Sequence, residues 1–206
     1  IFSNRTNENY LTDHHISVCI QISSDKTYFY PRVYFGNAAN KSSGFSYYTE
    51  AVGTKLPTDE QVHIAITMQH NEADNKVSII FYVNGKKATT RTSTLQCNNP
   101  AHTDGHKYTA EKFHIGGMVY GDSSSNIANS LKGYMKNFDI YNDVRTASEV
   151  SSDYSDGCST SDVNLISYYQ MGSRMSGNYK IEDWSQNQNG LIFTGERDGI
   201  SFDVND

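Results

Sequence analysis

The sequence predicts an all-β protein that forms one large sandwich, and three observations support this class. Apolar and polar residues alternate with a period of two in several runs, which is typical of strands with one buried face. Fifteen Tyr, nine Phe and many β-branched residues favour strands, while long stretches rich in Leu, Ala, Glu and Lys are scarce. A length of 206 residues suits one sandwich with a sizeable core, so two full domains are not expected.

The alternating runs are the predicted strands, and each is bounded by Gly, Asn, Asp or Pro. The first run places four apolar residues on one face and Cys19 on the other: Ile16, Val18, Ile20 and Ile22. The later runs cover residues 62–69, 77–83, 113–115 and 134–141. Asn84-Gly85 directly follows one run and predicts a tight hairpin turn. In the last run, we expect Lys136 or Asn137 to face solvent at a sheet edge.

One short helix is expected after the last of these runs. Thr146 and Glu149 are spaced as a capping box, in which each side chain satisfies the other residue's free backbone amide. This motif predicts a helix over about residues 147–154.

Several motifs in order carry a family resemblance: residues 61–67 (QVHIAIT), 81–86 (FYVNGK), 113–117 (FHIGG), 133–142 (GYMKNFDIYN) and 146–150 (TASEV). Over most of residues 10 to 157 the chain resembles the laminin-G-like, concanavalin-type jelly-roll family. The resemblance implies two packed antiparallel sheets, as in concanavalin-type lectins and glucanases. The chain departs from the family pattern at Cys19 and Val62, where Trp is common, and at Lys136, where an acidic residue is usual.

The C-terminal stretch resembles the opening of such a module. The motifs are residues 165–169 (LISYY), 183–190 (DWSQNQNG) and 199–203 (GISFD), whereas residues 1–9 look like a module already under way. We therefore predict a single sandwich over residues 1–206 in which residues 160–206 supply the opening strands in permuted order. The alternative is a domain over residues 1–157 followed by the start of a second module. Packing of the C-terminal segment against residues 10–40 would favour the first.

Asp183, Ser185, Asn187 and Asn189 place oxygen atoms at alternate positions, a pattern that can hold calcium. The Gly and distal Glu of an EF-hand are missing, and an Asn- and Gly-rich turn explains the same residues. Both interpretations stay open, and calcium is the one cofactor considered.

The cysteines and the N-glycosylation sequons are relevant to the cellular location of the protein. Three cysteines cannot all pair within the chain. Cys97 and Cys158 lie in turn-rich surroundings and are the candidate disulfide in an oxidising compartment, with Cys19 a buried thiol. Asn4 and Asn40 begin N-glycosylation sequons. We expect an extracellular or cell-surface protein.

Charge and motifs narrow the function. A net charge of −6 without a Lys/Arg cluster argues against nucleic acid, and no apolar run is long enough to cross a bilayer. The Glu-x-Asp-x-x-Glu strand motif of glucanases with this fold is missing, so we expect no catalysis. We expect a recognition or adhesion module that binds a glycan or an extracellular protein. The first alternative is a structural repeat whose partners are neighbouring similar modules, and the least favoured is a glycoside hydrolase of the same fold. Eight aromatic residues lie close together in sequence, and we expect most of them to be core and cross-strand partners and about two to be exposed for binding: Tyr28, Phe29, Tyr30, Tyr34, Phe35, Phe45, Tyr47 and Tyr48.

Overall fold

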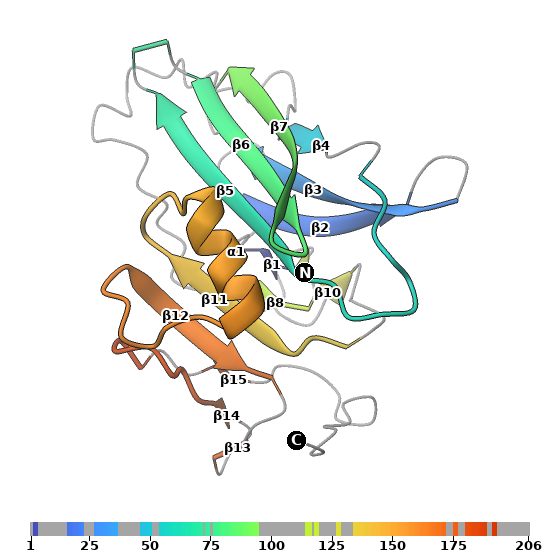
Figure 1. The fold of residues 1–206 in the computed structure, drawn as a ribbon. Helices are drawn as coiled ribbons and strands as arrows, with labels where there is room; N and C mark the ends of the chain where they lie inside the picture. The colour runs from blue at the N-terminus through green and yellow to red at the C-terminus, as the bar shows by residue number, and fades with distance from the viewer. Residues whose placement is uncertain are drawn as a thin grey trace. The chain divides into compact units, whose positions relative to one another are not determined.

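Strands of the computed structural model overlap each alternating run predicted from the sequence, whereas β3 (Phe29–Gly36) and β7 (Lys86–Thr94) lie outside those runs (Figure 1). The structure describes residues 2–3, 16–22, 27–36, 46–50, 54–71, 73–74, 76–94, 114–116, 118–119, 127–128, 134–171, 175–176, 180–188 and 191–192. The chain divides into two compact units, Ile1–Lys132 and Gly133–Asp206, which are described separately below.

The first unit contains a five-stranded antiparallel sheet with the order β4-β3-β2-β1-β8. Its strands are β1 (Phe2–Ser3), β2 (Ile16–Ile22), β3 (Phe29–Gly36), β4 (Ser46–Glu50) and β8 (His114–Ile115). In the β2–β3 pair, Ile16 lies opposite Phe35 and Ile22 lies opposite Phe29. The predicted first strand is thereby confirmed over its full length.

A second sheet of the same unit has the order β5-β6-β7, with strands β5 (Ile64–Asn71), β6 (Lys76–Val83) and β7 (Lys86–Thr94). The predicted hairpin turn is confirmed: Asn84 and Gly85 both have positive φ, at 48° and 72°. The side-chain oxygen of Asn84 also accepts the N–H of His63, the residue before β5, at 2.9 Å. A short pair, β9 (Met118–Val119) and β10 (Ile127–Ala128), completes the described strands of this unit.

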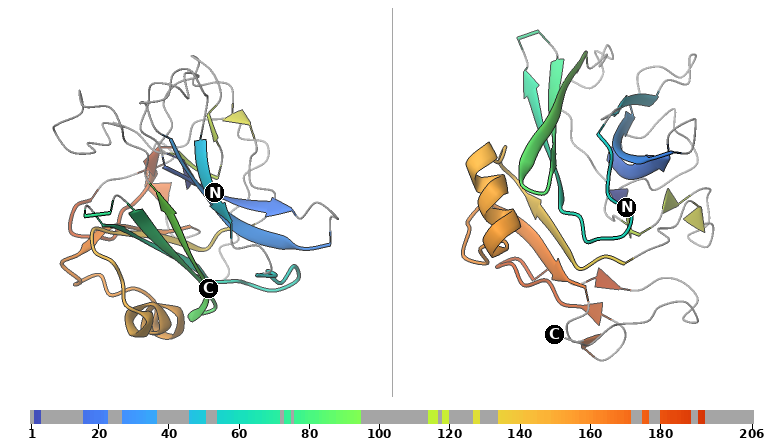
Figure 2. Two further views of the ribbon diagram at one scale, coloured as in Figure 1. Left: turned by 90° about the horizontal axis from the view of Figure 1, so that it is seen from above. Right: turned by 45° about the vertical axis from the view of Figure 1, so that its right-hand side comes forward.

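The core of the first unit lies between its two sheets. Val33 of β3 forms one buried cluster with Val77, Ile79 and Phe81 of β6, and Val18, Ile66 and Met68 pack against it. The alternate positions of β6 supply this face because successive side chains of a strand point to opposite sides. Figure 2 shows the two sheets facing one another. The predicted antiparallel sandwich is thus present in this unit.

The second unit is built around an antiparallel pair, β11 (Asn137–Tyr141) and β12 (Leu165–Gln170), with α1 (Ala147–Asp156) in the connection between them. Phe138 lies opposite Tyr169 and their rings stack at 6.4 Å. A further small sheet contains β13 (Met175–Ser176), β14 (Lys180–Ile181) and β15 (Leu191–Ile192). The strand predicted over 134–141 begins at Asn137, and Lys136 and Asn137 are exposed as expected.

The predicted helix is confirmed with its capping box. The Thr146 hydroxyl accepts the N–H of Glu149, and the Glu149 carboxylate accepts the N–H of Thr146 at 2.7 Å. The helix ends at Gly157, whose φ of 81° few other residues adopt without strain. In the part of the chain that the structure describes, no helix has the length and apolar character to span a membrane.

The domain prediction stays a prediction. β12, from the segment predicted to open a module, pairs with β11, from the region predicted to close one. The boundary between the two units lies between residues 132 and 133.

Candidate functional site

Three alternate side chains hold the segment after β14 against β12, and we call Asp183, Ser185 and Asn187 the polar brace. Asp183 Oδ1 accepts the backbone N–H groups of Tyr168 at 2.8 Å and Ser185 at 2.9 Å. Asp183 and Ser185 are buried, at 7 % and 4 % exposure. Buried backbone donors need acceptors, so the carboxylate satisfies two groups that would otherwise destabilise the fold.

The other two members of the polar brace bind the carbonyl groups of β12. The Ser185 hydroxyl donates to the Ile166 carbonyl at 2.9 Å and accepts the N–H of Asn187 at 3.2 Å. The Asn187 side-chain amide donates to the carbonyls of Ile166 at 2.8 Å and Leu165 at 3.3 Å. Every second residue of the segment is thereby fixed to the neighbouring strand.

These contacts bear on the calcium prediction. The structure brings Asp183, Ser185 and Asn187 together, but their polar atoms bind backbone groups, and Asn187 directs its nitrogen toward carbonyls. Asn189 lies outside the described residues. Within the described ranges, no group of three or more His, Cys, Asp or Glu is placed to hold a metal ion. The alternate polar residues have a structural explanation, and calcium stays a prediction.

The residues that alternate with the members of the polar brace are exposed to solvent. Glu182, Trp184 and Gln186 are all exposed, and Trp184 has 47 % of its surface open. The backbone N–H of Trp184 donates to the backbone carbonyl of Tyr168 at 2.8 Å, which fixes the backbone that carries the indole. Sequence reasoning did not single out Trp184. Two signals were available in the sequence: Trp184 is the one Trp of the chain, and it stands between two polar residues of the alternating pattern.

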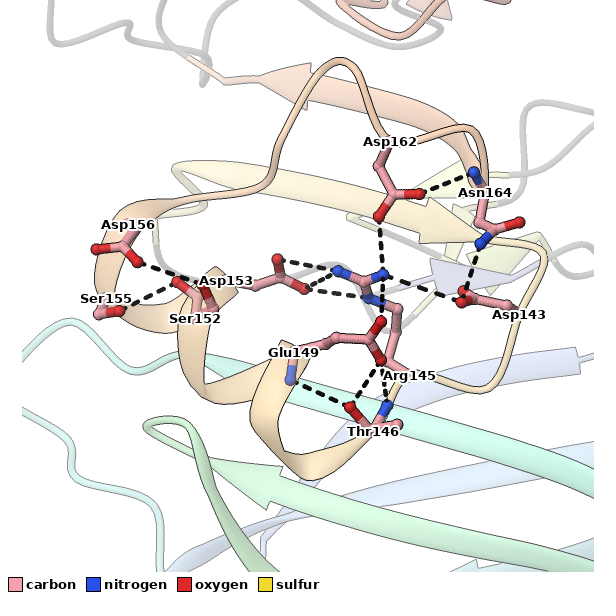
Figure 3. Close-up of polar contacts among 10 residues, drawn as sticks. All are labelled: Asp143, Arg145, Thr146, Glu149, Ser152, Asp153, Ser155, Asp156, Asp162 and Asn164. Atoms are coloured by element: carbon pink, nitrogen blue, oxygen red, sulfur yellow. Dashed lines mark hydrogen bonds and ion pairs between the residues drawn. The ribbon is translucent and has the colours of Figure 1, made fainter.

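A second feature that sequence reasoning missed is a charged cluster around Arg145 (Figure 3). The guanidinium pairs with Asp153 at 3.2 Å and with Asp162 at 2.8 Å. Glu149 and Asp143 lie farther away, at 3.5 Å and 3.9 Å. The Arg145 side chain is only 12 % exposed. The cluster therefore ties three segments together: the loop before α1, α1 itself, and the loop before β12.

Two of these partners follow Arg145 at helical spacing. Glu149 is four residues and Asp153 eight residues after Arg145, so both lie on the same side of α1. Arg145 also stacks on the ring of Tyr141, with its guanidinium carbon 4.1 Å from the ring centroid. Four carboxylates therefore surround one cation.

Burial changes the acidity of the groups beside this cluster. It raises the pKa of Asp139 from 3.8 to about 6, and nearby Asp153 adds to the effect. Burial, followed by the charges of Asp139 and Asp153, also raises the pKa of the Cys158 thiol to about 12. The thiol is therefore protonated near neutral pH and is a poor nucleophile. Burial likewise raises the pKa of Tyr141 well above its usual range.

The remaining predicted modifications are not tested. Cys158 is a free thiol in the structure, but Cys97 lies outside the described residues, so the disulfide stays a prediction. The glycosylation candidates Asn4 and Asn40 lie outside them as well. The side chain of Cys19 is likewise not described.

Of the eight clustered aromatic residues, the structure describes the side chains of three. Tyr30 is buried at 8 % exposure, whereas Phe29 is 39 % exposed. Tyr28 is half-buried, and the Lys55 ammonium lies 5.6 Å from the centre of its ring. The side chains of Tyr34, Phe35, Phe45, Tyr47 and Tyr48 lie outside the described set.

A comparison with protein families agrees with this architecture. A laminin G family model, described as the concanavalin A-like lectin/glucanases superfamily, matches residues 4–151. The chain belongs to this superfamily. No curated protein and no solved structure was found to match it. The superfamily's description names both lectins and glucanases, and membership supports a lectin-like or binding module in general. The match ends inside α1, so the polar brace lies beyond it.

Proposed function

We propose that this superfamily member is a non-catalytic recognition module that acts outside the cell and binds a glycan or another protein. The observation that carries the proposal is the outward face of the braced segment. There, an exposed Trp184 lies between two exposed polar residues on a backbone fixed to β12. Aromatic rings with a few well-placed polar groups are typical of recognition sites.

The acidic residues support binding over catalysis. A retaining or inverting glycosidase needs two carboxyl groups facing one another across the scissile bond. In the described part of the second unit, Asp143, Glu149, Asp153 and Asp162 surround Arg145, and Asp183 accepts backbone N–H groups. These carboxylates have structural roles that account for their positions.

A glycan-array screen of the whole chain, run with calcium and again with a chelator, tests the proposal. We expect binding to a defined group of glycans in both conditions, because the side chains of the polar brace form hydrogen bonds with backbone groups of the protein. Hydrolysis of any bound glycan would contradict the non-catalytic part. Silence in both conditions would contradict glycan binding and leave a protein partner, including a neighbouring similar module.

The extracellular location has its own test. If the chain matures in an oxidising compartment, mass spectrometry of the secreted protein should detect sugar on Asn4 or Asn40 and a peptide linked through Cys97 and Cys158. Unmodified asparagines together with three free thiols in the protein isolated from its natural source would contradict the proposed location.

A further inference from the structure

The braced segment displays three different side chains on one side. Ile181, Asp183 and Ser185 are buried at 4 %, 7 % and 4 % exposure, whereas Glu182, Trp184 and Gln186 are exposed. Residues 181–184 alternate as in an extended backbone, in which every second side chain points the same way, and a bend at Ser185 and a turn at Gln186 follow. A carboxylate, an indole and an amide therefore follow one another along the surface, and we call Glu182, Trp184 and Gln186 the outward row.

The outward row is rigid because its backbone is fixed from both sides of the tryptophan. The backbone N–H of Trp184 donates to the Tyr168 carbonyl at 2.8 Å. On one side of the tryptophan, Asp183 Oδ1 accepts two backbone N–H groups. On the other side, the Ser185 hydroxyl donates to the Ile166 carbonyl. A ligand that bound here would not need to order the backbone first, which lowers the entropic cost of binding.

We propose that the outward row is a binding site for a neutral saccharide, an inference that rests on the recognition function proposed above. The indole of Trp184 would stack on the apolar C–H face of a pyranose ring. The Glu182 carboxylate would accept hydrogen bonds from sugar hydroxyls, and the Gln186 amide would both donate and accept.

Charge favours a neutral ligand over an anionic one. Residues 133–206 contain twelve acidic and five basic residues, and Glu182 belongs to the row itself. A sulfated or carboxylated sugar would be disfavoured by Glu182 and by the net negative charge of this unit, because like charges oppose association.

The neighbours of the indole favour a sugar over a protein. Gln186, Asn187 and Gln188 are exposed and polar, and Glu182 is exposed on the other side. A protein hot spot usually surrounds its aromatic anchor with other groups that exclude water. A single ring between hydrogen-bonding side chains instead matches a ligand that has one apolar face and a rim of hydroxyl groups.

The chain contains its own reporter, because Trp184 is its only tryptophan. The whole chain is titrated with neutral trisaccharides of glucose, galactose, mannose and N-acetylglucosamine, and with dextran sulfate as the anionic probe. Stacking on the indole should shift the tryptophan emission to shorter wavelengths in a saturable way. It should also protect the emission from acrylamide quenching with at least one neutral sugar and not with dextran sulfate.

Variants then assign the binding to the outward row. By calorimetry, Trp184→Ala should weaken binding at least about 10-fold and Glu182→Gln by less, while Trp184→Phe should keep part of the affinity. The matched control is Tyr134→Ala, which removes an aromatic residue that is 91 % exposed in the same unit and should leave the affinity unchanged. Thermal unfolding of each variant checks that the fold is intact.

The outcomes separate this inference from the proposed function. Binding of a neutral glycan that leaves the emission unchanged and survives Trp184→Ala would overturn the site while the recognition function stands. Binding of dextran sulfate alone would overturn the neutral class. No glycan binding in either the array or the titrations would overturn both the site and glycan recognition.

Discussion

Arg145 stacks on the ring of Tyr141 at 4.1 Å and, with the same guanidinium, forms an ion pair with Asp153 at 3.2 Å. One side chain thus joins β11, which contains Tyr141, to α1, which contains Asp153. Asp162 adds the loop that leads into β12. Loss of Arg145 should therefore destabilise the contacts among all three segments.

Replacing Arg145 by Ala should lower the free energy of unfolding by about 3 to 5 kcal/mol, because Asp153 and Asp162 would lose their cation while little exposed to solvent. Arg145→Lys should recover only part of the loss, since Lys has neither the planar fork nor the stacking face. Urea unfolding measures both. The control is Lys76→Ala, which breaks an exposed ion pair with Asp74 and should cost less than about 1 kcal/mol. An equally small loss for Arg145→Ala would contradict the structural role.

Asp139→Asn should stabilise the protein in a pH-dependent way. Because the folded state raises the pKa of Asp139 from 3.8 to about 6, the folded chain holds a proton there between about pH 4 and 6 that the unfolded chain has lost. The carboxyl group therefore disfavours folding most above pH 6, and its penalty disappears as the pH falls toward 4. The gain from the variant should be up to about 3 kcal/mol at pH 7 and close to zero at pH 4.

Urea unfolding of Asp139→Asn and the wild type at several pH values measures this difference. Glu60→Gln, at an exposed acidic residue, is the matched control and should show little change at any pH. A destabilised Asp139→Asn at pH 7 would contradict the prediction.

Asp183→Ala should lower the free energy of unfolding by about 1 to 3 kcal/mol, because the N–H groups of Tyr168 and Ser185 lose their buried acceptor. Asp183→Asn keeps an oxygen at this position and should cost less. The neighbouring exposed residue supplies the control, Glu182→Ala, for which we expect a change within about 0.5 kcal/mol.

Repeating the Asp183 series with calcium and with a chelator separates the two roles considered for this residue. A purely structural brace predicts the same loss in both solutions. Calcium that raises the unfolding midpoint of the wild type but not of Asp183→Ala would instead favour a metal site.

Asn84→Ala should destabilise the β6–β7 hairpin by roughly 1 to 2 kcal/mol. Asn84 has a φ of 48°, which Ala adopts at a cost, and its side-chain oxygen accepts the N–H of His63. Asn84→Asp keeps the acceptor and tolerates this φ, so it should lose much less. Thermal unfolding compares the two, and an equal loss in both would show that neither property matters.

Local patterns predicted much of the fold. The alternation at Ile16 to Ile22, the Asn84-Gly85 turn and the Thr146/Glu149 capping box each depend on residues close in sequence, and each is confirmed. The second unit was harder to predict. The contacts of Asp183 with Tyr168 and of Arg145 with Asp162 join residues 15 and 17 positions apart, and such pairings have no local signature.

The calcium prediction and the candidate site concern the same segment but different side chains, and the calcium site stays a prediction. Alternating oxygen-bearing residues drew attention to Asp183, Ser185 and Asn187, whose side chains bind β12. The same alternation implied that Trp184 lies on the opposite side. Whether that side is open depends on burial, which the sequence pattern of one segment does not determine.

The pairing of β11 with β12 also affects how far the chain can be shortened. The family match ends at residue 151, within α1, while β12, Asp153 and Asp162 all follow it. A chain cut at that point would leave the backbone groups of β11 that pair with β12 without a partner. It would also leave Arg145 without its two nearest carboxylates. An unpaired strand edge can associate with the same edge of another molecule, so such a fragment would tend to aggregate.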